Sequence, residues 1–320
     1  MKTKRILIIG GTGFLGGNLA RRLAAQGHQL RLPSRRRERA KHLLMLPTAE
    51  VVQADVHDPA QLQSLLSGQD VVINLVGILQ GGNGRAGEPY GAGFARAHVE
   101  LPRRIAEAAK AAGVRRMLHV SALKAAADAP SGYLRSKAAG EAVLREAGLD
   151  LTIFQPSVVF GAGDSFLNVF AKLLGLVPFL PLACPDARFQ PVWVEDVSAC
   201  ILGSLSHRAS IGVTYELCGP RLYTLRQLVD YVGVVTGNRR PIIGLPDALS
   251  YLQAWAMEFI PGGPLTRDNY ASMQVPNVCA EGCRLPFGLT AASLEAVAPG
   301  YLRGHGAKIR LGSLRSKAGR

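Results

Sequence analysis

The stretch that decides the fold is Ile6–Gly16, with the sequence ILIIGGTGFLG. Its four consecutive aliphatic residues are typical of a parallel strand that is buried on both faces. Three glycines at three-residue spacing then permit a tight turn, a close approach of the backbone to a pyrophosphate, and close packing of the next helix. We expect that helix to cover residues 14–26 and to direct its N-terminal amides at the anion. The predicted phosphate-binding residues are Gly10, Thr12, Gly13, Phe14, Leu15 and Gly16.

Apolar strands alternate with amphipathic helices beyond this stretch. The expected strands cover residues 29–32, 50–56, 71–77 and 115–121, and the expected helices begin at Pro59, Phe94 and Tyr133. Asp58 is the expected N-cap of the first of these helices. The alternation predicts an α/β fold, a Rossmann-type doubly wound parallel sheet, in which ligands bind at the carboxyl ends of the strands.

The residues that follow the second strand indicate which cofactor binds. An acidic residue about 20 positions after the glycines would hold the ribose 2'-hydroxyl of NAD. Ser34 and Arg35 stand there instead, and a guanidinium suits a 2'-phosphate, so we expect NADP(H), with NAD(H) as the alternative. Asp55 and Val56 are predicted to contact the adenine, and Val76 and Gly77 to lie under the adenosine half of the cofactor.

A second pattern carries the predicted chemistry. Tyr133 and Lys137 form YxxxK, and on a helix these two side chains share one face. A neighbouring cation favours phenolate, so Tyr133 becomes usable as a general acid or base near neutral pH. Ser121, 12 residues earlier at a strand end, is predicted to polarise a substrate oxygen. His119 and Asn74 are interpreted as buried core residues.

The charge of the chain is +14 and is unevenly distributed. Residues 21–41 carry eight Lys or Arg and one acid, and residues 303–320 carry six and none. We expect the first cluster to meet a phosphate and the tail to be disordered, with docking on a membrane surface or partner as the alternative. No aromatic residues interleave with the basic ones, which argues against a nucleic-acid partner.

The five cysteines are odd in number and scattered, so we expect no disulfide framework and a reducing compartment. Cys279 and Cys283 are interpreted as ordinary thiols, and no metal is predicted. Residues 166–184 are interrupted by polar residues and prolines, and we predict no transmembrane segment.

The C-terminal part has fewer strands. We expect a cofactor domain at 1–161 with a return segment at 189–211, a smaller substrate lobe at 162–188 and 212–302, and the basic tail at 303–320. Residues 248–260, ALSYLQAWAMEFI, form a predicted helix that is apolar nearly all round. We interpret Trp255, Met257 and Phe259 as core residues. The alternative is an interfacial face that contacts lipid or an isoprenoid tail.

The glycine stretch together with YLRSK resembles the extended short-chain dehydrogenases/reductases. QPSVVFG at 155–161 is similar to the segment that holds the nicotinamide there, which implies cofactor contacts for Gln155, Pro156 and Val158. HVSAL and GAGDSFLNVFAKLL resemble most the branch that contains accessory subunit 9 of the alpha subcomplex of respiratory complex I. The asparagine of the usual catalytic tetrad is replaced here, around Ala97 and His98.

The resemblance implies two functions, and a redox-sensing regulator that uses its cofactor only as a signal is a third alternative. One is an oxidoreductase or a nucleotide-sugar epimerase that transfers hydride through Tyr133 and Lys137. The other is a non-catalytic protein that retains its cofactor in a respiratory complex or in quinone metabolism. The substrate is an unidentified small molecule, hydrophobic or a nucleotide sugar, and the oligomeric state is a monomer or a homodimer. The expected location is cytoplasmic, with peripheral attachment to the inner membrane as the alternative.

Overall fold

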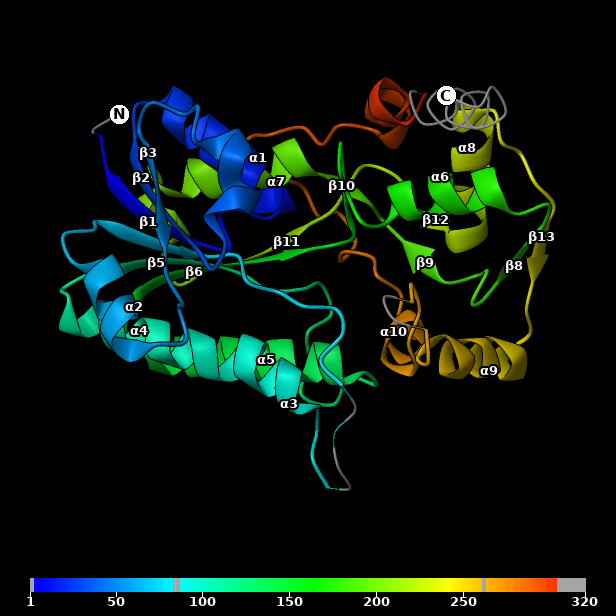
Figure 1. The fold of residues 1–320 in the computed structure, drawn as a ribbon, viewed down its shortest axis with the longest axis horizontal. Coiled ribbons are helices and arrows are strands. Elements are labelled where there is room, and N and C mark those ends of the chain that lie inside the picture. Colours follow the sequence, from blue (N-terminus) through cyan, green and yellow to red (C-terminus); the bar gives the residue numbers. More distant parts are fainter. Residues whose placement is uncertain (1–2, 83, 85–86, 261–262, 304–320) are drawn as a thin grey trace. The chain divides into compact units, whose positions relative to one another are not determined.

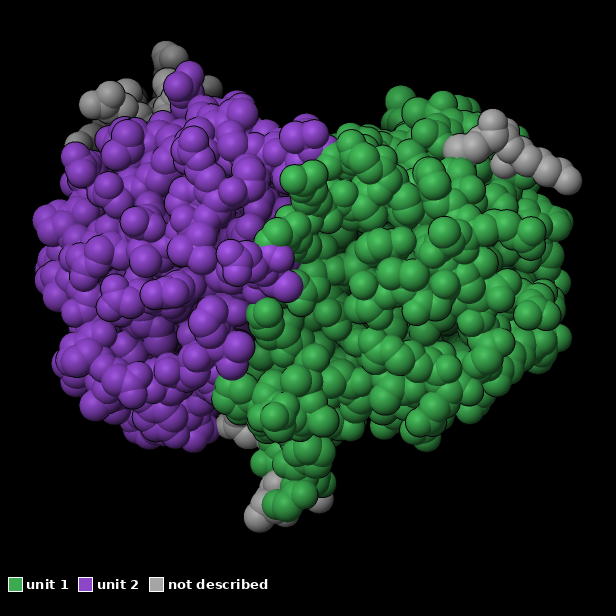
Figure 2. Space-filling view, turned by 180° about the vertical axis from the view of Figure 1, so that it is seen from behind, with its two compact units in different colours: residues 1–156, 194–217, 282–289 green, residues 157–193, 218–281, 290–320 purple. Residues whose placement is uncertain are grey.

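The computed structural model describes residues 3–82, 84, 87–260 and 263–303. Parts of the expected loop at 80–93, and all of the expected tail except Arg303, lie outside these residues. The chain divides into two compact units, coloured separately in Figure 2. The first comprises Met1–Pro156, Val194–Leu217 and Gly282–Leu289, and the second comprises Ser157–Trp193, Cys218–Glu281 and Thr290–Arg320.

A seven-stranded sheet forms the centre of the first unit. Its strand order is β11-β6-β5-β4-β1-β2-β3, and every neighbouring pair is parallel. The strands are β1 (Arg5–Ile9), β2 (Gln29–Ser34), β3 (Ala49–Gln53), β4 (Val71–Asn74), β5 (Arg116–Val120), β6 (Asp150–Pro156) and β11 (Thr214–Leu217). The order reverses between β1 and β4, which is the switch point at which doubly wound sheets bind ligands. This confirms the predicted α/β class.

Helices cover both faces of this sheet (Figure 1). On one face lie α1 (Phe14–Ala25) and α7 (Val194–Ser204), and on the other lie α2 (Pro59–Leu66), α4 (Leu101–Ala111) and α5 (Gly132–Glu146). Asp58 caps α2 by accepting from the amides of Ala60 and Gln61. The core between the sheet and α2, α4 and α5 is aliphatic and includes Leu7, Ile9, Leu62, Val72, Ile105 and Leu144. Short 3-10 helices lie at Arg37–Leu43 and Arg208–Ser210.

Two predicted boundaries differ from the observed ones. The helix expected from Phe94 is α3 (Ala92–Phe94), then a π-helical stretch (Ala95–Glu100), then α4, with Pro102 in the first turn of α4. The residues of β11 were expected in the substrate lobe, yet β11 pairs with β6 as the last strand of the sheet. β11 has only four residues, and their mixed burial gives no hydrophobic pattern from which the sequence could assign the strand to the sheet.

The second unit consists of short strand pairs and helices around its own core. The strand pairs are β7 (Val159–Phe160) with β10 (Val192–Trp193), β8 (Leu180–Leu182) with β13 (Ile242–Gly244), and β9 (Arg188–Phe189) with β12 (Tyr223–Thr224). Its helices are α6 (Leu167–Leu176), α8 (Leu225–Thr236), α9 (Asp247–Met257) and α10 (Arg267–Met273), and residues 294–303 are also helical. Apolar residues of α6, α8 and the 294–303 helix form one cluster. None of the helices in the described part of the chain is both long and apolar enough to cross a bilayer.

Two predictions for the second unit are wrong. Trp255 and Phe259 are not core residues, since 43% and 70% of their surfaces are exposed, and Met257 is only half-buried. A helix that is apolar all round does not reveal which face turns inward. Cys279 is not a free thiol, because it is bonded to Cys218 across 61 residues of sequence, with their Cα atoms 6.1 Å apart. Spacing along the chain cannot reveal such a pairing.

The close contact of α1 with the glycine turn yields a prediction. A Cβ at Gly16 would overlap the carbonyl oxygen of Gly10 and the backbone of Gly11, whereas one at Gly17 would meet side chains alone, the nearest being His42 at 3.3 Å. We expect Gly16→Ala to lower the free energy of unfolding by about 3 kcal/mol. The matched Gly17→Ala variant should stay within about 1 kcal/mol of wild type. Urea denaturation measures both, and equal losses would contradict the packing role of Gly16.

Candidate cofactor and catalytic site

The glycine turn after β1 adopts a conformation that a side chain would block. Gly10 has a φ of 84°, in the left-handed region, and a Cβ there would lie 3.2 Å from the carbonyl carbon of Leu75 and the amide nitrogen of Val76. The turn is closed by hydrogen bonds from Gly11 to Ile8 and from Gly13 to Gly10, at 3.2 and 3.1 Å. The glycine turn therefore lies directly against the end of β4.

Helix α1 begins at this turn. Gly13 is its N-cap, with an extended backbone and no side chain to cap the first amides, and Gly17 donates to the Gly13 carbonyl at 2.8 Å. The first turn contains no acid. Backbone amides at an uncapped helix start attract anions such as a pyrophosphate.

Arg35 follows the last residue of β2 and is exposed, as expected for a residue that binds a phosphate. Within the described residues its guanidinium has no hydrogen bond or ion pair. Arg31, in contrast, is structural, because its guanidinium donates to the carbonyls of Ser64, Leu65 and Ser67 at the end of α2. Ser34 exchanges hydrogen bonds with the backbone of Arg36, which fixes the turn that presents Arg35.

Asp55 and Val56 lie just beyond the end of β3. The Asp55 carboxylate accepts from the amide of His57 at 3.0 Å, and Val56 packs against the aliphatic core. His57 was not predicted as a site residue, and its Nδ1 is buried with no partner among the described residues. Burial and the charges of Arg96, Arg104 and Arg35 lower the pKa of His57, so that its imidazole is neutral and can accept or donate through one nitrogen.

The end of β4 connects the glycine turn to the YxxxK helix. Asn74 is buried. Its side-chain Oδ1 accepts from the Val76 backbone amide, and its Nδ2 bonds to His119 Nδ1, as expected for a core residue whose polar atoms have partners. A Cβ at Gly77 would lie 3.3 Å from the Lys137 ammonium nitrogen. Val76, Gly77 and Lys137 therefore lie together at the carboxyl edge of the sheet.

Lys137 is almost fully buried, with 3% of its surface exposed. Its Nζ donates to the carbonyls of Val76 and Val120, at 3.3 Å each. Burial lowers the pKa of Lys137 to about 8, and the nearby carboxylate of Glu141 opposes that shift. The ammonium is thus held by two strand ends, one turn of α5 away from Tyr133.

Tyr133 lies in the first turn of α5, which Ser131 caps by accepting from the amide of Leu134 at 3.2 Å. Its ring is half-buried and packs edge-on against Phe94 and His98, with centroids 6.1 and 5.6 Å away. Ser121 follows β5, and its hydroxyl is buried without a partner in the described part of the chain. A buried hydroxyl without a partner is costly, and a bound ligand oxygen would satisfy it.

His98 is a further residue whose role the sequence did not reveal. It lies in the π-helical stretch, where its Nε2 accepts from the Ile78 amide at 3.1 Å and its Nδ1 is 2.8 Å from the Ser136 hydroxyl. Burial and the charge of Lys137 lower its pKa to about 2, so the ring stays neutral. His98 therefore ties the loop after β4 to α5 beside Lys137.

Glu141, one turn of α5 after Lys137, is buried and pairs with the partly buried Gln155. The Gln155 amide donates to Glu141 Oε1 at 2.7 Å, and Arg145 donates to Oε2 at 2.8 Å. The side chain of Gln155, predicted from the resemblance to contact the cofactor, thus has a structural partner. Pro156 ends β6, and Val158 belongs to the core of the second unit.

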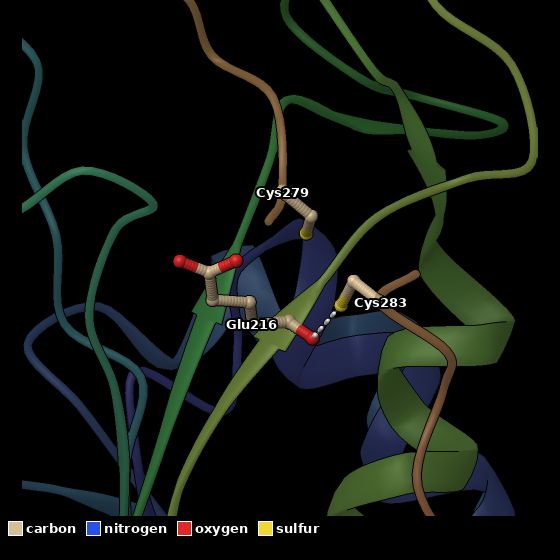
Figure 3. Close-up of side chains that lie close together, drawn as sticks. All are labelled: Glu216, Cys279 and Cys283. Atoms are coloured by element: carbon tan, nitrogen blue, oxygen red, sulfur yellow. Dashed lines mark hydrogen bonds between the residues drawn. The ribbon is translucent and has the colours of Figure 1, made fainter. Parts of the chain in front are cut away.

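Figure 3 draws three further side chains of types that ligate metals, Glu216, Cys279 and Cys283. The Cys279 sulfur is bonded to Cys218 and is not a thiolate. The Cys283 thiol donates to the Glu216 main-chain carbonyl at 3.5 Å, and burial raises its pKa. These bonds give no support for a metal centre at these residues.

Comparison with known proteins agrees with this geometry. Residues 10–163 match the NAD(P)H-binding family. The chain is 33% identical to a ceramide reductase of Caulobacter vibrioides over 258 residues, which are 78% of each protein. It is 34% identical to subunit 9 of the NADH dehydrogenase (ubiquinone) 1 alpha subcomplex of Mus musculus over 254 residues, which are 78% of this chain but only 64% of that one.

Among solved structures, UDP-glucuronic acid 4-epimerase from Bacillus cereus, in complex with UDP-glucuronic acid and NAD, superimposes with a TM-score of 0.70. The match covers 96% of this chain and 99% of that one at 16% identity, which establishes the fold alone. The fold and the matched domain define an NAD(P)-binding protein. The chain belongs to the superfamily of extended short-chain dehydrogenases/reductases.

The burial of Lys137 yields a prediction for stability against pH. Its folded pKa is lower than its unfolded value, so the unfolded chain binds more protons between about pH 8 and pH 10.5. In that range the free energy of unfolding of wild type should rise relative to Lys137→Met by up to about 3 kcal/mol. Below pH 8 the difference should be constant. Chemical denaturation of both proteins measures it, and a difference independent of pH would show that the ammonium is not buried.

Proposed function

We propose that the protein is an NADP(H)-dependent reductase that converts a carbonyl group of an apolar, lipid-like substrate to an alcohol. The observation that carries the proposal is the buried Lys137 ammonium, which lies at the ends of β4 and β5 and shares one face of α5 with Tyr133. A buried cation costs free energy, and a chain retains one when function requires it.

The residues present fit a phosphorylated dinucleotide. Glycines at 10, 13 and 16 let the turn fold tightly, since a Cβ at any of them would press on backbone atoms, and α1 starts there without a side-chain cap. Arg35 supports NADP(H) over NAD(H), because an exposed guanidinium at the end of β2 suits the 2'-phosphate. His57 and Asp55 are suited to the adenine edge. When bound, NADPH supplies the hydride.

The chain's own residues supply the proton and the positioning. Lys137 stabilises the phenolate form of Tyr133, so that the phenol can give its proton to the carbonyl oxygen as hydride reaches the carbonyl carbon. The unpartnered Ser121 hydroxyl is suited to donate a hydrogen bond to that oxygen. The products are then an alcohol and NADP⁺, and solvent reprotonates Tyr133.

The similarity to a ceramide reductase supports a lipid-like carbonyl substrate. The epimerase structures are under 25% identical and carry no argument for a nucleotide sugar.

A second candidate is a non-catalytic protein that retains its cofactor and contacts a respiratory complex, supported by the similarity to mouse subunit 9. Exchange of bound nucleotide separates the two. A reductase must release NADP⁺ in each cycle, whereas a structural cofactor survives dialysis against an excess of labelled nucleotide.

Cofactor choice is tested by Arg35→Asp. Losing the charge-assisted hydrogen bonds to the 2'-phosphate should weaken NADPH binding about a hundredfold, with little effect on NADH. Arg115→Asp is the matched control. Arg115 is exposed and precedes β5, so it lies at the amino ends of the strands, whereas Arg35 lies at the carboxyl ends. Fluorescence titration gives both dissociation constants. An unchanged preference in Arg35→Asp would refute the assignment of the 2'-phosphate site.

The proton donor is tested by Tyr133→Phe. With long-chain ketones as substrates, kcat for NADPH oxidation should fall about 100- to 10,000-fold, because general acid catalysis is lost. The affinity for NADPH should stay close to that of wild type. Tyr215→Phe, on β11, is the control and should keep full activity. Turnover by Tyr133→Phe at the wild-type rate would remove the phenol from the mechanism.

A further inference from the structure

The π-helical stretch before α4 presents an exposed guanidinium. Arg96 lies in this stretch, Ala95–Glu100, and its side chain reaches the surface of the first unit. Among the described residues it has no hydrogen bond or ion pair. The stretch and α4 follow β4 and precede β5, so the stretch begins at the carboxyl ends of the strands, where a doubly wound sheet binds its ligand. An unpaired guanidinium at this edge is available to an anion.

The neighbours of Arg96 show which way its side chain faces. About one turn further on, Glu100 pairs with Arg104 at 3.8 Å, and Arg104 also donates to the His57 carbonyl at 2.9 Å. This side of the helix therefore faces the loop between β3 and α2. Burial is the main cause that lowers the pKa of His57, and the charge of Arg96 is the next, ahead of those of Arg104 and Arg35. Arg96 thus lies near the His57 ring.

Arg35 approaches the same ring from the sheet. The last residues of β2 and β3 pair with each other, so Arg35, one residue further, lies next to the loop that carries His57. Neither Arg35 nor Arg96 pairs with a carboxylate of that loop, since Asp55 accepts from the His57 amide and Asp58 from amides at the start of α2. Two unpaired guanidiniums from separate elements thus act on one imidazole, and a bound anion would stabilise both.

We propose that Arg96 is a second specificity-determining residue for the cofactor, and that it shares the 2'-phosphate of NADP(H) with Arg35. A phosphate monoester has three terminal oxygens and nearly two negative charges at neutral pH, so it can accept hydrogen bonds from two guanidiniums at once. The inference rests on the proposed function, because it requires a phosphorylated dinucleotide. It adds a residue outside the dinucleotide-binding motif, which only the fold brings to the ends of β2 and β3.

Two nucleotide fragments test the role of Arg96 without catalysis. Adenosine 2',5'-bisphosphate carries the 2'-phosphate, and 5'-AMP lacks it. In isothermal titration calorimetry, Arg96→Gln should weaken binding of the bisphosphate about 10- to 100-fold, because charge-assisted hydrogen bonds are lost, and leave 5'-AMP binding within about twofold of wild type. Arg96→Lys keeps the charge but not the fork of donors, so it should recover part of the loss.

Lys110→Gln is the matched control. Lys110 is an exposed cation in the last turn of α4, and a helix that connects two parallel strands runs back toward their amino ends. This variant removes the same charge as Arg96→Gln at the far end of the helix, and it should bind both fragments like wild type. If Arg96→Gln bound the bisphosphate like wild type, or lost both fragments equally, the proposal would be overturned.

The shared phosphate is tested by combining substitutions. Arg35→Gln alone should keep part of the preference for the bisphosphate, because Arg96 still binds the phosphate. Arg35→Gln with Arg96→Gln should bind the bisphosphate no more tightly than 5'-AMP. A double variant with the same preference as Arg35→Gln would show that Arg96 does not contact the phosphate.

Failure of this inference can be distinguished from failure of the proposed function. A wild-type protein that binds the bisphosphate no more tightly than 5'-AMP would overturn the preference for NADP(H), and the inference with it. A wild-type preference that falls in Arg35→Gln but not in Arg96→Gln would overturn the role of Arg96 alone.

Discussion

The position of one buried ammonium group is the constraint on which the site depends. Lys137 loses its hydration when α5 packs on the sheet, and among the described residues the carbonyls of Val76, just beyond β4, and of Val120, at the end of β5, replace it. Those carbonyls are free to accept because they lie where the two strands stop pairing. The Gly77 backbone must also pass close to the ammonium, where a side chain would crowd it. The ends of β4 and β5, the position of α5 and the glycine at position 77 therefore all depend on accommodating the Lys137 ammonium.

The elements around Lys137 are held by a second set of buried polar groups. Gly140 lets α5 approach the π-helical stretch so closely that a Cβ would overlap the carbonyl of His98. His98 lies within this π-helical stretch and bonds to both the Ile78 amide and the Ser136 hydroxyl. Because its pKa is about 2, this imidazole adds no charge next to the ammonium. The π-helical stretch is thus part of the site and no irregularity of α4.

The first unit was largely predictable because its signals are local. The apolar runs, the N-cap Asp58 and the glycine spacing each specify a conformation within a few residues, and the observed elements follow them closely. The pairing of His98 with Ser136 and that of Glu141 with Gln155 were not predictable, since these partners are 38 and 14 residues apart in sequence and meet only after the sheet has formed. The disulfide between Cys218 and Cys279 was not predicted for the same reason. The type of a residue indicates which bonds its side chain can form, but only the fold determines which partner forms them.

Helix α9 illustrates a different limit. Hydrophobicity predicts that a side chain gains by leaving water, but it does not identify the partner that removes the water. Trp255 and Phe259 were predicted to lie in the protein interior, whereas Ser250 and Ala254 are the residues that α9 buries. Small residues on the inner side let α9 lie close to its unit, while Leu252, Trp255 and Phe259 remain largely exposed. Within the described part of the chain, α9 thus has small residues on its inner side and leaves its aromatic residues largely exposed.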